Sequence, residues 1–147
     1  MFKKQNKKGM SLIEIMIVVA IVGILMVVVI PNYRRIQEQS NVAKAKSELR
    51  SLQTAVENYY VHNGSYPAAL NDVTSATPNI VSSIPDDVFA SSGTYGYDRG
   101  GTGDYYYVLY SVGPDGTGSA SIGSDVVTET DGSSCIYVSN AGTDTTP

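Results

Sequence analysis

The sequence predicts an α+β fold in which one long N-terminal helix carries a small antiparallel β-sheet. Three observations predict it. An almost unbroken apolar run covers positions 10–30, and apolar residues then recur at helical spacing as far as position 59. The last 85 residues, 63–147, are rich in Gly, Ser, Thr, Asp and Tyr and contain strand-like alternation. The total of 147 residues is enough for one modest domain.

The apolar run is long enough to cross a membrane. As a helix its 21 residues span about 32 Å, close to the thickness of a bilayer core. Four lysines precede it, and such a basic flank stays in the cytoplasm. The run is longer than the apolar region of a secretory signal, about 7–15 residues, and no small-x-small cleavage site follows it. We therefore expect a span or anchor rather than a removed signal peptide.

Glu14 is the one charged residue inside this run. A carboxylate in the middle of a membrane span costs about 2.5–3.5 kcal/mol on insertion scales, and such residues usually have a partner. Two interpretations remain open. Glu14 either reaches toward the headgroups from the helix end, or it pairs with a cation of another chain.

The helix is expected to continue past the membrane with a kink near Pro31, which removes a backbone donor. Lys44 and Glu48 are spaced for an i,i+4 ion pair, and Asn63-Gly64 is a helix stop. These signals predict a helix over 10–62, about 80 Å long. The basic side chains between 34 and 50 are expected on a solvated or inter-subunit face. The apolar face of its second half consists of Val42, Ala45, Leu49, Leu52, Val56 and Tyr59.

The remaining residues predict a small sheet. Positions 105–112 give the strongest strand signal, and both of its faces are apolar enough for a central strand. Positions 94–97 and 135–139 are its expected partners, joined through Gly/Asp-rich turns, and a short helical turn is expected near 68–73. Because 85 residues make a thin core, the second half of the helix is expected to complete the fold.

Charge and composition exclude several classes of function. Nine of the ten basic residues lie in positions 1–50 beside three acids, whereas 51–147 carry one Arg against eleven acids. An acidic C-terminal part argues against a nucleic-acid module, so no nucleic-acid partner is expected. One Cys cannot form a disulfide framework, and one His with one Cys cannot build a zinc cluster. His62 lies at the expected helix end with no second titrating partner, so no catalytic residue is assigned.

The loop after the expected central strand is a candidate ion site. It runs over 113–125, is rich in glycine, and has an acid near each end, Asp115 and Asp125. Calcium takes six to eight oxygen ligands, which these carboxylates and the backbone carbonyl of Val112 could begin to supply. The loop offers no nitrogen or sulfur side chain for zinc or copper. The spacing is not that of an EF-hand, so an ordinary Asp-Gly turn remains the alternative.

Residues 7–25 resemble the N-terminus of the type IV pilin and pseudopilin superfamily. The matching features are a short basic leader ending in Gly9, a Leu-Ile-Glu motif that places Glu14 five residues later, and an apolar helix containing Gly23 and Pro31. The chain departs from the family at Met10, where Phe is most common.

This resemblance implies a pilin-like fold and a sequence of processing and assembly steps. Prepilin peptidase is expected to cut between Gly9 and Met10 and to N-methylate Met10. Glu14 is then expected to meet the new α-amino group of a neighbouring subunit, with Gly23 and Pro31 belonging to the same assembly segment. Further implied partners are an inner-membrane assembly platform and minor pilins or pseudopilins. The implied parts are a leader (1–9), a membrane and assembly half of the helix (10–31), an amphipathic half (32–62) and a β-rich head (63–147).

The head resembles the major pseudopilin of type II secretion systems. The resemblance rests on 107–116, on Tyr66-Pro67 and on 84–89. It implies a structural calcium, with Asp115 matching the first aspartate of that family and Asp125 the nearest candidate for the second. Type IVa major pilins often close a C-terminal loop with a disulfide, which the single Cys135 cannot do.

The favoured function is therefore that of a non-enzymatic filament subunit, held in the bacterial inner membrane and then assembled into a periplasmic pseudopilus. The first alternative is a type IV pilus pilin in an extracellular fibre for adhesion or motility. More remote alternatives are a membrane-anchored periplasmic enzyme, or a binding module that uses some of the eleven tyrosines.

Overall fold

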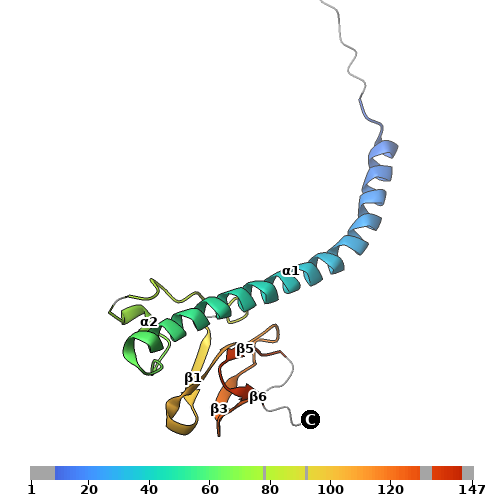
Figure 1. Ribbon diagram of the computed structural model, residues 1–147. Coiled ribbons are helices and arrows are strands. Elements are labelled where there is room, and N and C mark those ends of the chain that lie inside the picture. The colour runs from blue at the N-terminus through green and yellow to red at the C-terminus, as the bar shows by residue number, and fades with distance from the viewer. Residues whose placement is uncertain (1–8, 78, 92, 130–133, 144–147) are drawn as a thin grey trace, which may run out of the picture. The chain divides into compact units, whose positions relative to one another are not determined.

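The computed structural model describes residues 9–77, 79–91, 93–129 and 134–143. The chain divides into two compact units, Met1–Gln37 and Glu38–Pro147, which we describe one at a time. Helix α1 spans Leu12–Asn63 and contributes to both units (Figure 1). The predicted helix over 10–62 is thereby confirmed to within two residues at each end.

The first unit has no core of its own. Every large apolar side chain described in this unit is exposed, from 42% for Ile15 to 83% for Leu12. Among the described residues no single helix qualifies as a membrane span, although the stretches Leu12–Val27 and Asn32–Asn63 qualify as a bent pair. The helix is continuous through position 31. The bend of this pair falls across positions 28–31, where the sequence predicts a kink at Pro31.

The second unit is built on one face of α1. Most of the predicted apolar face is confirmed as core: Ala45, Leu49, Leu52 and Val56 are at most 2% exposed, whereas Val42 and Tyr59 are half-buried. The helix ends where the sequence predicts. Gly64 takes a φ of +73°, and its N–H donates to the carbonyl of Tyr60 at 2.8 Å, a typical glycine stop.

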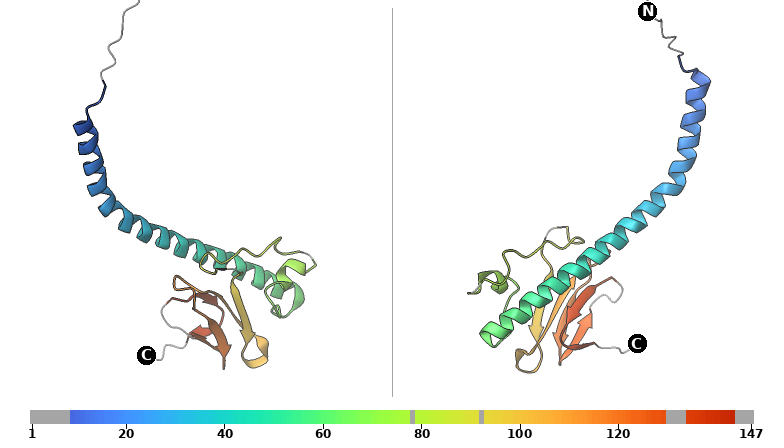
Figure 2. Two further views of the ribbon diagram at one scale, coloured as in Figure 1. Left: turned by 180° about the vertical axis from the view of Figure 1, so that it is seen from behind. Right: turned by 45° about the horizontal axis from the view of Figure 1, so that its top comes forward.

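The predicted central strand is confirmed. Strand β2 (Tyr106–Ser111) lies between β1 (Gly96–Gly100) and β5 (Ile136–Ser139), and both pairings are antiparallel. Figure 2 shows this sheet beneath the second half of α1. In the register, Leu109 of β2 stands opposite Val138 of β5.

A second sheet was not predicted. Strand β3 (Ala120–Gly123) pairs antiparallel with β4 (Val126–Glu129), which pairs in parallel with β6 (Gly142–Thr143). Ser124 and Asp125 form the two-residue turn between β3 and β4, with φ of 48° and 69°. Positive φ at both positions is the signature of a type I′ hairpin turn.

The head is therefore a three-layer structure, with the first sheet between α1 and the second sheet. Tyr107 and Leu109 face the helix core, whereas Val108 packs with Ala120 and Val127 of the second sheet. Burial on both faces explains why apolar and aromatic residues occupy both faces of β2 from Tyr106 to Tyr110. The one-turn helix α2 (Asp72–Ser75) and the 3-10 turn η1 (Thr102–Asp104) lie in the connections.

Candidate assembly site

The bond between Gly9 and Met10 lies outside regular structure. Both residues are exposed, Met10 by 72%, and helix α1 begins only at Leu12. A Cβ added to Gly9 would meet nothing within 4 Å. An exposed, non-helical peptide bond is open to a protease, as the predicted cleavage requires.

Glu14 lies in the first turn of α1, and its side chain makes one of the two bonds of a capping box. The N–H of Glu14 donates to the carbonyl of Ser11 at 3.0 Å, and the N–H of Ser11 donates to Oε2 of Glu14 at 3.4 Å. This reciprocal pair satisfies two backbone donors at the helix start. In a single copy the carboxylate is thus held by its own helix, a role that the sequence analysis did not consider. Its Oε1 atom has no hydrogen bond within the described residues, so it is available to a neighbouring amine.

The apolar surface around Glu14 is not covered by any of the described residues. A helix that is apolar on all sides is normally buried in lipid or among other helices. Gly23 lies in this surface, and an added Cβ would meet nothing within 4 Å. No contact among the described residues requires a glycine there, whereas a second helix approaching closely would.

Two glutamates fasten α1 to the head. Glu48 accepts a hydrogen bond from the hydroxyl of Tyr95 at 2.5 Å, and Lys44 pairs with the same carboxylate at 3.7 Å, the predicted i,i+4 pair. Glu57 accepts from the hydroxyls of Tyr107 at 2.7 Å and of Tyr66 at 3.3 Å.

The tyrosines of this network stay protonated well into the alkaline range. Burial, followed by the hydrogen bond to the glutamate, raises the pKa of Tyr95 and of Tyr107 well above the ordinary value of 10.0. Glu57 was missed by the sequence analysis, since its partner Tyr107 lies 50 positions away.

The predicted calcium ligands are not brought together. Asp115 is exposed in the turn after β2. The carbonyl of Val112 already accepts from the N–H of Gly118 at 2.9 Å and from the hydroxyl of Ser134 at 3.5 Å. Among the described residues no three His, Cys, Asp or Glu side chains are grouped to hold a metal ion. As a set, the predicted ligands do not fit calcium.

Asp125 belongs to the opposite end of β2. It occupies the β3–β4 turn and accepts from the N–H of Thr102 at 2.5 Å and from its hydroxyl at 3.0 Å. Thr102 precedes β2, whereas Asp115 follows it, and six strand residues span about 20 Å. Asp125 therefore holds the β3–β4 hairpin against the β1–β2 connection.

A buried carboxylate, Asp87, holds the turn after β2 instead. It is 4% exposed and accepts from the hydroxyl of Ser111 at 2.8 Å and from the N–H groups of Phe89 at 3.0 Å and Val112 at 2.9 Å. Three donors compensate a buried carboxylate for its lost hydration. Asp87 lies inside the 84–89 motif, but its role depends on contacts about 25 positions away.

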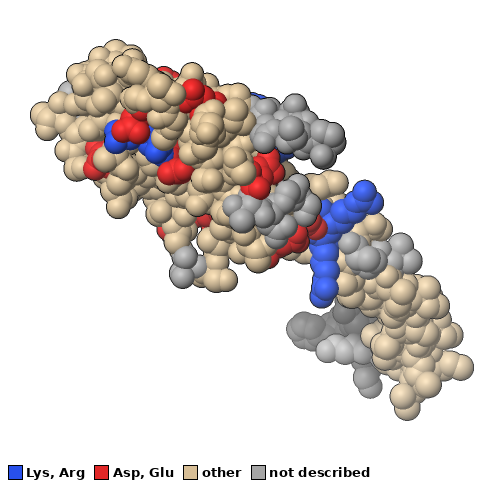
Figure 3. Space-filling view, turned by 90° about the horizontal axis from the view of Figure 1, so that it is seen from below, with Lys and Arg blue, Asp and Glu red and all other residues tan. Residues whose placement is uncertain are grey.

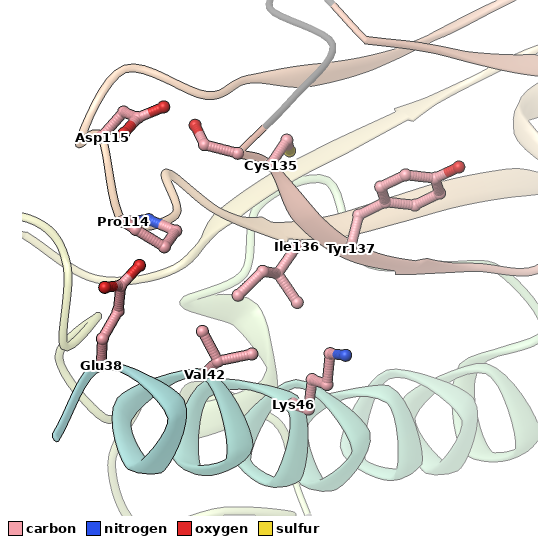
Figure 4. Close-up of a pocket in the computed structure, with 9 residues that line it drawn as sticks. Glu38, Val42, Lys46, Pro114, Asp115, Cys135, Ile136 and Tyr137 are labelled. Atoms are coloured by element: carbon pink, nitrogen blue, oxygen red, sulfur yellow. The ribbon is translucent and has the colours of Figure 1, made fainter. Parts of the chain in front are cut away.

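Cys135 lines a cavity of about 530 Å³ between α1 and the ends of β2 and β5 (Figure 4). The thiol is free, and burial raises its pKa from 9.0 to about 11. His62 is exposed at the end of α1, where its Nδ1 donates to the carbonyl of Asn58 at 2.9 Å. Neither residue forms part of a catalytic arrangement among the described residues.

Two family descriptions match the chain side by side. Residues 4–30 match the prokaryotic N-terminal methylation motif, and residues 32–129 match type II secretion system protein G. The second match includes the amphipathic half of α1 and most of the head.

Curated relatives fall into two groups. The type II secretion system core protein G of Klebsiella pneumoniae is 31% identical over 127 residues, covering 76% of this chain and 88% of the relative. The type IV major pilin PilA of Myxococcus xanthus is 39% identical over 72 residues, and a fimbrial protein of Pseudomonas aeruginosa is 42% identical over 72 residues. Each pilin match covers 49% of this chain, but only 32% and 43% of the relative. No solved structure gave a significant match.

Proposed function

The chain belongs to the family of type II secretion system protein G, and from this premise we propose that it is the major, repeating subunit of a pseudopilus. It is a structural protein, not an enzyme, and its N-terminal motif marks it for prepilin peptidase. The observation that carries the proposal is that the two parts of α1 have different surroundings. Its first part exposes apolar side chains on all sides, whereas its second part is fixed to a folded head.

Processing creates the charge that assembly uses. Hydrolysis of the bond between Gly9 and Met10 removes four lysines and leaves one α-amino group at the membrane end of the helix. When a neighbour's Glu14 meets this amine, each charge is compensated in a medium where an unpaired charge is costly. The free Oε1 of Glu14 gives the amine a place to bind without breaking the capping bond.

We infer a location and partners from the same features. Before assembly the apolar run holds the subunit in the inner membrane as a single span, with the basic leader in the cytoplasm. An inner-membrane platform then moves subunits into a periplasmic filament in which the apolar helices pack together. Minor pseudopilins are the expected partners at its end.

The test is expression of the full chain together with its own prepilin peptidase and secretion genes, followed by electron microscopy of the filaments. The wild type is expected to form filaments, and Glu14→Leu is expected to remain in the membrane and to reduce filament yield strongly. Asn58→Leu is a matched control, because it places a leucine at an exposed polar position of α1 outside the apolar run. Normal filament yield from Glu14→Leu would contradict the pairing with the amine.

A surface pilus is the second candidate, favoured by the 39% identity to the Myxococcus xanthus pilin. That similarity covers about half of this chain, whereas the match to protein G continues into the head. Deletion of the gene separates the two. Loss of protein secretion with no loss of surface fibres supports the pseudopilus, and loss of abundant surface fibres with normal secretion supports the pilus.

A further inference from the structure

We propose that the cavity beside Cys135 is a docking site between subunits, and that its occupant is the Arg34–Arg35 segment of a second copy of this chain. The proposal rests on the proposed function, because a filament is what brings copies of the chain together at a repeated spacing. It names the residues of a contact that neither the family descriptions nor the relatives specify.

The two arginines form no ion pair with a carboxylate among the described residues. Both are exposed. In the described part of the chain the ion pairs are Lys44 with Glu48 at 3.7 Å and Arg99 with Asp104 at 3.2 Å, and neither includes position 34 or 35. An arginine that enters an interface without an anion loses its hydration and gains no ion pair to compensate for that loss.

Their place in the sequence brings them into the filament. Arg34 and Arg35 follow the apolar run by only a few residues. When that run packs among the helices of other copies, the residues directly after it are drawn among those copies too. The proposed occupant is thus continuous in sequence with the apolar assembly surface.

The cavity has the complementary charge. Figure 4 shows the carboxylates of Glu38 and Asp115 at one end and the ammonium group of Lys46 toward the other. Two carboxylates and one ammonium sum to −1, so one guanidinium would neutralise the cavity. Acidic side chains are also spread over the face of the head drawn in Figure 3, in keeping with the excess of acids in residues 51–147.

The walls suit an arginine rather than a small cation. Val42 and Ile136 form an apolar floor along which the methylene stem can lie, and Tyr137 offers an aromatic ring. A guanidinium carries five donors in a planar fork, which fits carboxylates in pairs and stacks on aromatic faces. The volume of about 530 Å³ is ample for such a side chain.

The chain's single cysteine allows a direct test. Arg35→Cys in the full chain places a second thiol on the proposed occupant, while Cys135 marks the cavity. In assembled filaments, oxidation or a short bismaleimide is expected to join Cys135 to the new thiol of the next copy. The contact is head-to-tail, so the products form a ladder of multiples rather than dimers alone. Monomers dispersed in detergent should give no ladder. The matched control is Arg50→Cys, which changes another exposed arginine of α1 and should give none.

A charge exchange keeps the proposal testable if Arg35→Cys does not assemble. Asp115→Arg and Arg35→Glu are each expected to lower filament yield roughly tenfold, and the double variant to restore most of it. The proposal is overturned if Arg35→Cys filaments form but give no ladder, or if the double variant yields no more filaments than the single ones. Absence of filaments from the wild type would instead count against the proposed function.

Discussion

Replacing Asp87 by alanine should weaken the head more than any change to an exposed acid. The substitution removes the acceptor for three donors: the hydroxyl of Ser111, which is 0% exposed, and the N–H groups of Phe89 and Val112. A hydrogen bond to a charged group contributes about 1.5–3 kcal/mol, and a buried donor left unpaired costs about 1–3 kcal/mol. Water can reach the two half-buried N–H groups, which lowers the cost of leaving them unpaired. We therefore expect the free energy of unfolding to fall by about 3–5 kcal/mol in total.

Thermal unfolding of the full chain in detergent, followed by tyrosine fluorescence, measures this loss. At roughly 3–5 °C for each kcal/mol in a domain of this size, Asp87→Ala should lower Tm by about 10–20 °C. Asp115→Ala is the matched control, because that carboxylate is exposed and accepts no hydrogen bond within the described residues. Its effect should stay within about 0.5 kcal/mol. The reasoning is refuted if the two variants melt within a few degrees of each other.

Three further predictions concern the same head. Tyr107→Phe removes the hydrogen bond to Glu57 and should cost about 1–2 kcal/mol in the same assay, whereas an unchanged Tm would argue against this tether. The pKa of Cys135 is raised from 9.0 to about 11, so the unfolded chain loses this proton first and stability should fall between pH 9 and 11. Allowing for solvent screening of a half-buried thiol, Cys135 contributes roughly 1 kcal/mol to this loss, and Cys135→Ser should lose that much less than the wild type. The loss that remains above about pH 10 comes from the buried tyrosines Tyr95 and Tyr107. Chelation by EDTA should leave Tm unchanged, because hydrogen-bond donors of the protein hold the turn after β2. A fall in Tm of several degrees would instead be evidence for a bound calcium ion.

The parts of the fold that were predictable depend on local periodicity. Three features depend only on residues that are close together in the sequence. They are the helical spacing from Ala45 to Val56, the glycine stop after Asn63, and the apolar residues on both faces of β2. These features need no knowledge of distant contacts, and the structure confirms them.

The missed parts depend on contacts distant in sequence. Strands β3 and β4 are four residues each, and their turn uses Ser124 and Asp125 rather than the usual Asn-Gly, so the segment resembled an ion-binding loop. A carboxylate's role depends on which donors reach it. Asp125 binds a threonine 23 positions earlier, and Asp87 binds residues 24 and 25 positions later. Sequence spacing alone does not distinguish such structural acids from metal ligands.

The most direct measurement is the intact mass of the subunit in purified filaments. If the chain is a pseudopilin that is cut after Gly9, filament subunits begin at Met10, carry one added methyl group on the amine, and lack residues 1–9. The uncut precursor should be found only in the membrane fraction. Filaments built from subunits that retain residues 1–9 would contradict both the processing and the pairing of the new amine with Glu14.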